Sequence, residues 1–137
     1  MADKMSTHSA LVHVMVLTAC ADKELAEEEI RLMGEMIRTW PVFRSYDIDQ
    51  LAADSESCLA YLEKDDGIDD MMDDIADVLP ARLSETAYAL ACDVAAADGD
   101  LTQTELEVLM IIRQSLGVSR LHAAAIEVGA RARAMTI

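Results

Sequence analysis

A pattern of carboxylates occurs twice in this chain, at a constant offset of 76 residues. The two copies lie within residues 17–33 and 93–109 and align without a gap, which indicates an internal duplication. Each copy has an Asp, a second acid two residues later and a Glu seven residues after the first Asp; these are Asp22, Glu24 and Glu29 in the first copy and Asp98, Asp100 and Glu105 in the second. We refer to the two segments as the acidic corners.

Oxygen ligands of this kind suit hard divalent cations such as Ca²⁺ or Mg²⁺. Neither corner has the residue order of an EF-hand loop. The second corner is the stronger candidate, because Gly99 can adopt a positive φ and turn the backbone, whereas Lys23 stands at that position in the first and adds a positive charge. Asp93 lies five residues before Asp98 and is a further candidate ligand. The metal hypothesis therefore includes Asp93 with the six corner acids.

A structural role explains the same residues. Thr102 to Glu105 is a capping-box sequence, in which the Glu side chain satisfies a backbone amide at the start of a helix. Ala26 stands at the equivalent position of the first corner and cannot form this cap, although the acids persist there. Asp93 is alternatively a boundary acid paired with an Arg. Both interpretations stay open at this point.

Helical periodicity dominates the elements that must position these residues, and strand-like alternation is nearly absent. Pro41 and Pro80 end two of the predicted helices, Asp47 and Ser119 begin two others, and Gly117 is a natural residue to follow a helix. We expect helices near 6–21, 27–38, 84–97 and 103–116 to form a central bundle related pairwise by an approximate two-fold axis. The predicted fold is all-α, a single domain over residues 1–137 with six to seven helices.

Composition narrows the function classes. The formal charge of −15 argues against binding to nucleic acid, whose phosphates would be repelled. The longest apolar stretch, from Ala10 to Ala21, is too short to cross a bilayer, and no signal peptide precedes it, so the expected location is the cytoplasm. Three cysteines without metal-binding spacing are expected to be reduced. A run of aspartates between residues 65 and 77 is either a solvated helix face or a docking surface for a basic partner.

The repeated corners resemble those of the TerB-like tellurite-resistance family, from Ala19 to Glu29 and from Ala95 to Glu105. Residues 40–43 and 113–117 strengthen the resemblance, which covers roughly residues 8–120. It implies an all-α domain of two inverted helical repeats, divalent-cation binding at the corners, and a role in bacterial tellurite resistance and stress response with membrane-associated Ter proteins. It implies no enzymatic activity. Lys23 departs from the Asp-Gly usual in the family.

The leading hypothesis is therefore a cytosolic binding module in which Ca²⁺, Mg²⁺ or Zn²⁺ fixes the corners and the acidic surface engages a protein partner. No organic cofactor and no insertion into a membrane are expected, and self-association stays open. One alternative is a hydrolase that uses a corner-bound cation to activate water. It lacks an evident His or Lys for proton transfer. The other is a purely structural helical domain whose acids cap helices and confer solubility.

Overall fold

The computed structural model describes residues 5–21, 27–97 and 101–137 of the chain, and in this part it contains seven α-helices and no strand. The predicted all-α fold is confirmed. The helices are α1 (Thr7–Ala19), α2 (Glu27–Thr39), α3 (Leu51–Leu62), α4 (Gly67–Val78), α5 (Ser84–Ala96), α6 (Gln103–Ser115) and α7 (Arg120–Arg133). Three short 3₁₀ helices, η1 (Pro41–Phe43), η2 (Ile48–Gln50) and η3 (Ala81–Leu83), lie in the connections.

The helix ends follow the local sequence signals. Ser6 caps α1 and Ser119 caps α7, each accepting a hydrogen bond from a backbone amide three residues on. Asp47, predicted to begin the third helix, instead caps η2, and α3 starts after it at Leu51. Gly117 has φ +69° and follows α6 as predicted.

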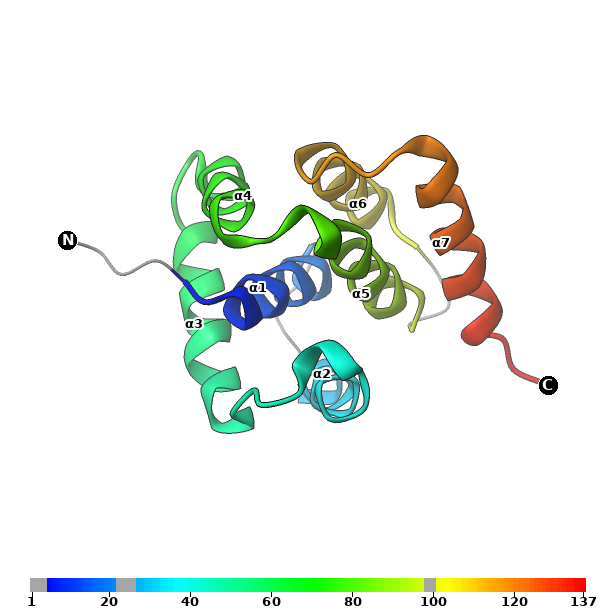
Figure 1. Cartoon of the computed structure of the whole chain (residues 1–137), viewed down its shortest axis with the longest axis horizontal. Helices are drawn as coiled ribbons and strands as arrows, with labels where there is room; N and C mark the ends of the chain where they lie inside the picture. The colour runs from blue at the N-terminus through cyan, green and yellow to red at the C-terminus, as the bar shows by residue number, and fades with distance from the viewer. Residues whose placement is uncertain (1–4, 22–26, 98–100) are drawn as a thin grey trace.

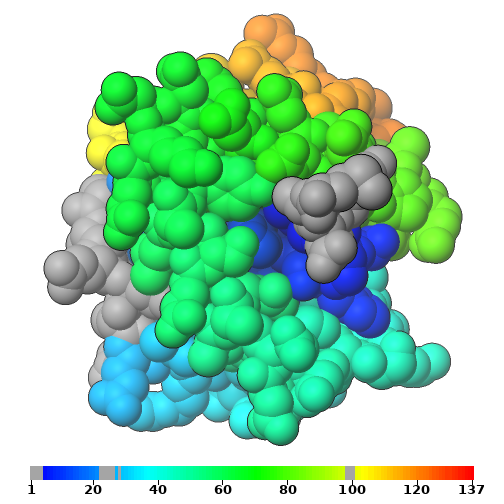
Figure 2. Space-filling model, turned by 90° about the vertical axis from the view of Figure 1, so that its left-hand side faces the viewer, coloured from blue at the N-terminus to red at the C-terminus, as the bar shows by residue number. Residues whose placement is uncertain are grey.

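Helix α1 lies at the centre of the molecule beside α5 (Figure 1). Every residue from Ala10 to Ala19 is buried, because α3, α4, α5 and α6 all pack against this helix. The side chains of Leu11 and Met15 are fully buried. Figure 2 shows α3 and α4 covering one side of α1, which is partly visible between them. Helix α1 is apolar on nearly all sides, and it therefore forms the centre of the hydrophobic core.

Helix α2 is peripheral, although the sequence placed residues 27–38 in the central bundle. Its apolar side chains occupy one face, where Met33, Met36 and Ile37 are buried, while Arg31 and Glu35 are exposed. A helix with one apolar face covers a core and does not form its centre. The main neighbours of the central pair are α3 on α1 and α7 on α5. Helices α1, α2, α5 and α6 each have 13 residues. Their two-fold relation stays a prediction.

A polar network that the sequence did not reveal joins α1 to α3. The buried carboxylate of Asp54 accepts hydrogen bonds from Ser9 Oγ at 2.8 Å and from Tyr46 Oη at 2.6 Å. One turn along α1, His13 Nε2 lies 2.9 Å from Ser57 Oγ and His13 Nδ1 lies 2.6 Å from the Ser9 carbonyl oxygen. The buried acid and imidazole are thus hydrogen-bonded, as burial requires.

Candidate functional site

The first acidic corner connects α1 to α2. Asp22 and Glu24 lie outside the described residues, so Glu29, the third residue of α2, represents this corner. Glu29 is half-buried, and its charge acts on Cys20, the residue that caps the C-terminal end of α1. Burial is the main cause that raises the pKa of the Cys20 thiol to about 11, and the negative charge of Glu29 is the second. The Glu29 carboxylate is therefore close enough to the end of α1 to influence its electrostatics.

The second corner connects α5 to α6. Asp98 and Asp100 lie outside the described residues, whereas Glu105 is buried and begins α6 with Thr102 in a capping box. The Thr102 hydroxyl accepts a hydrogen bond from the Glu105 amide at 3.1 Å, and Glu105 Oε1 accepts one from the Thr102 amide at 3.1 Å. The capping interpretation of Glu105 is confirmed. Like Glu29, Glu105 is the third residue of its helix, where the helix dipole stabilises a negative charge.

Asp93 binds an arginine of α7, as its alternative interpretation predicted. Its two carboxylate oxygens accept hydrogen bonds from Arg133, at 2.7 Å from Nη2 and at 3.3 Å from Nε. This hydrogen bonding is the main cause that raises the pKa of Arg133. Because the Arg133 side chain is 57% exposed, the ion pair contributes little to stability, and it is one of the contacts that join α7 to α5.

Replacing Thr102 with alanine removes the hydroxyl half of the capping box. We expect Thr102→Ala to lower the free energy of unfolding by about 1 kcal/mol, the usual cost of losing such a cap. Urea denaturation followed by circular dichroism measures the change. Thr104→Ala, two residues on and also exposed, is the matched control and should leave stability within about 0.5 kcal/mol. Equal losses in the two variants would contradict the role of the cap.

The structure does not assemble a metal site from the described acids. Within residues 5–21, 27–97 and 101–137, no group of three or more His, Cys, Asp or Glu side chains could hold a metal ion. Four of the seven predicted ligands, Asp22, Glu24, Asp98 and Asp100, lie outside those ranges. Each corner thus contributes one described acid at the start of a helix, and cation binding stays a prediction.

The run of aspartates on α4 and in the turn before it is exposed, as expected of a solvated face. Three of its members line a polar hollow of about 460 Å³ between α3 and α4. The Tyr61 hydroxyl, at the edge of this hollow, donates a hydrogen bond to Asp74. Burial and then this hydrogen bond raise the pKa of Tyr61 to about 12. The exposed members are Asp65, Asp66, Asp69, Asp70, Asp73, Asp74 and Asp77.

The fold and the acidic corners define the class of this protein: an all-α helical domain with two acid-rich helix connections. The chain matches the family model of the tellurite resistance protein TerB over residues 8–128 and belongs to this family. The resemblance inferred from the corners is thereby confirmed. No curated protein and no solved structure matches the chain. In the described residues, no helix is long and apolar enough to cross a membrane.

Proposed function

We propose that this TerB-family domain is a cytoplasmic, cation-responsive interaction module of tellurite resistance and stress response, without enzymatic activity of its own. In this proposal a divalent cation binds an acidic corner and fixes the angle between two helices. The observation that carries it is the equivalent placement of Glu29 and Glu105, each the third residue of the helix that follows its corner. Only the second corner has a capping threonine, so capping does not account for the acids of the first.

The acidic face of α4 supports the second half of the proposal. Five exposed aspartates of α4 and two in the turn before it span residues 65–77, and this dense negative charge attracts a basic protein surface over roughly one Debye length. A basic surface on a membrane-associated Ter-type protein is the partner that family membership suggests. Such binding should weaken as the salt concentration rises.

Thermal denaturation with Ca²⁺, Mg²⁺ or Zn²⁺ tests the cation. If the metal is present at 100 times its dissociation constant, binding adds about 2.7 kcal/mol to stability and should raise the midpoint of the parent protein by roughly 10 °C. Asp98→Asn should lose most of this response, because the second corner has the glycine that a tight turn needs. Asp22→Asn should lose less.

Asp73→Asn removes an exposed carboxylate from the α4 face, far along the sequence from either corner, and is the control for a general effect of charge. It should respond to metal as the parent does. If no metal raises the parent midpoint, or if Asp98→Asn responds like the parent, cation binding at the second corner is refuted. The alternative of a purely structural domain, in which the acids only cap helices and confer solubility, would then account for the corners.

A further inference from the structure

An apolar groove of about 840 Å³ lies between α6 and α7. Both helices pack on α5, which forms its floor, and they appear on the same side of α5 in Figure 1. The side chains of Leu106 and Met110 line one wall and are 44% and 52% exposed; Val128 lines the other and is 55% exposed. Apolar residues at helical spacing are normally buried, but Leu106 and Met110 of α6 are exposed. Their exposure leaves an apolar surface on this helix.

Exposed apolar side chains are concentrated in this part of the molecule. Of the ten large hydrophobic residues exposed in the described chain, seven belong to residues 101–137. A monomeric protein rarely leaves a continuous apolar surface unless the surface binds something. The remaining three, Ile30, Ile48 and Leu59, lie on other elements and are isolated examples of ordinary surface residues.

The segment that supplies both walls of the groove differs in charge from the rest of the chain. Residues 101–137 contain four Arg and three Glu, a formal charge of +1, so the −15 of the whole chain leaves −16 for residues 1–100. Three charged residues line the groove: Arg113, Arg131 and Glu127, whose carboxylate accepts the hydrogen bond of the Tyr88 hydroxyl. Among the described residues, neither guanidinium has an ion-pair partner, and Arg113 makes one long hydrogen bond, from Nη1 to the Val118 carbonyl at 3.5 Å. Two cationic groups are thus available beside an apolar surface.

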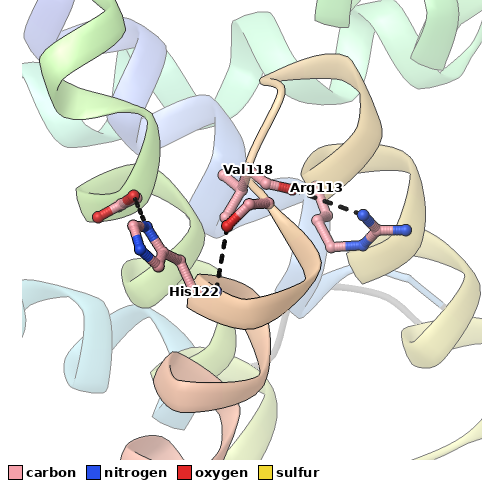
Figure 3. A network of polar contacts seen from close by, with 5 residues as sticks. Arg113, Val118 and His122 are labelled. Carbon is pink, nitrogen blue, oxygen red and sulfur yellow. Dashed lines mark hydrogen bonds and ion pairs between the residues drawn. The ribbon is translucent and has the colours of Figure 1, made fainter.

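Polar contacts join α7, one wall of the groove, to α5, its floor. Along α7, His122 Nδ1 lies 2.5 Å from Glu85 Oε2, and Glu127 accepts a hydrogen bond from the Tyr88 hydroxyl at 2.5 Å. With the Arg133 ion pair, these contacts fix α7 to α5 along its length. Figure 3 shows the link between α6 and α7, where Val118 lies next to Arg113 while His122 reaches α5. A wall positioned in this way reduces the rearrangement that binding would require.

We infer that this groove binds an amphipathic helix of a partner protein, with apolar side chains against α6 and α7 and acidic side chains beside Arg113 and Arg131. Leu106, Met110 and Val128 would remain exposed beside a narrow small molecule, whereas a helix about 10 Å wide covers both walls. A second copy bound by the same face would bring arginines near arginines. The inference rests on the proposed interaction role, but it uses none of the corner acids and needs no cation.

Binding to the full chain is tested with two labelled designed peptides of about 15 residues, long enough to form a helix in the groove. Both carry the same leucine stripe, flanked by Glu in one and by Lys in the other. Fluorescence anisotropy in EDTA should show binding of the Glu peptide. Met110→Gln/Val128→Gln should weaken it at least tenfold, and Arg131→Gln should weaken it severalfold without affecting the Lys peptide.

Leu59→Gln is the matched control, since Leu59 is 39% exposed on α3 and does not line the groove. It should leave binding unchanged. Absence of binding, equal affinity for the Lys peptide, or an equal loss in Leu59→Gln would overturn the inference. So would a parent dimer in sedimentation velocity that Met110→Gln/Val128→Gln converts to a monomer, because the occupant would then be a second copy. Peptide binding without any metal response would refute the cation proposal and leave the groove intact.

Discussion

Replacing Gly67 with alanine is expected to lower the free energy of unfolding strongly, although the change adds only one methyl group. Gly67 is the first residue of α4, and a Cβ atom there would lie 1.7 Å from the Tyr61 carbonyl oxygen and 2.6 Å from its carbon. Both atoms are backbone, so no side chain can rotate away. The turn between α3 and α4 would have to open, and we expect Gly67→Ala to cost about 3–5 kcal/mol of unfolding free energy.

Gly34 provides the control for this prediction. It lies inside α2, and a Cβ atom added there meets nothing within 4 Å. Gly34→Ala should therefore stabilise the protein by about 0.5–1 kcal/mol, because alanine loses less backbone entropy in a helix than glycine does. Urea denaturation of the two variants should give changes of opposite sign. If Gly67→Ala costs less than about 1 kcal/mol, the close approach of α4 to α3 is not a tight contact.

The sequence predicted the helices well because their ends depend on neighbouring residues. Pro41 and Pro80 cannot continue a helix, Ser119 caps one, and Gly117 takes the left-handed conformation that ends another. These effects act over a few residues, so the local sequence contains them. The contact of Gly67 with Tyr61 depends in addition on the angle at which two helices meet, and helical periodicity carries no information about that angle.

The same limit explains which functional features were and were not predictable. The Thr102–Glu105 cap and the Arg partner of Asp93 were anticipated, the first from spacing alone. The exposure of Met110 was not, since an apolar residue at helical spacing is normally buried, and its exposure depends on how the helices pack around it. Asp54 gave no signal either, because its partners come from residues 8 and 45 positions away in the sequence. Two corner acids of each copy lie outside the described residues, so their role as metal ligands stays a prediction from the sequence.

A steep loss of stability at alkaline pH is the second large effect that we expect. All three cysteines are free thiols, and Cys58 and Cys92 are buried with side chains at most 4% exposed. Burial is the main cause that raises the pKa of each of these two thiols from 9.0 to about 12. The unfolded chain therefore releases their protons near pH 9, while the folded chain retains them.

The free energy of unfolding must fall as the pH rises wherever the unfolded state binds fewer protons than the folded state. Between pH 8 and pH 10 each buried thiol should account for a loss of about 1.4 kcal/mol, or about 3 kcal/mol for the pair. The loss continues until the pH reaches the raised pKa values near 12, above which the folded thiols ionise as well. Urea denaturation at pH 8, 9 and 10 in the presence of a phosphine reductant measures it.

The double variant Cys58→Ala/Cys92→Ala isolates the contribution of the two thiols. Its absolute stability is lower because of the volume removed from the core, but that cost is the same at every pH and cancels in the comparison. Cys20 and the three tyrosines are present in both proteins, so the two proteins differ only in the small parts of the raised pKa values of Tyr61 and Tyr88 that come from Cys58 and Cys92. The variant should lose about 3 kcal/mol less than the parent between pH 8 and pH 10. Parallel curves for the two proteins would refute the prediction, because they would mean that Cys58 and Cys92 ionise as readily in the folded chain as in the unfolded one despite their burial.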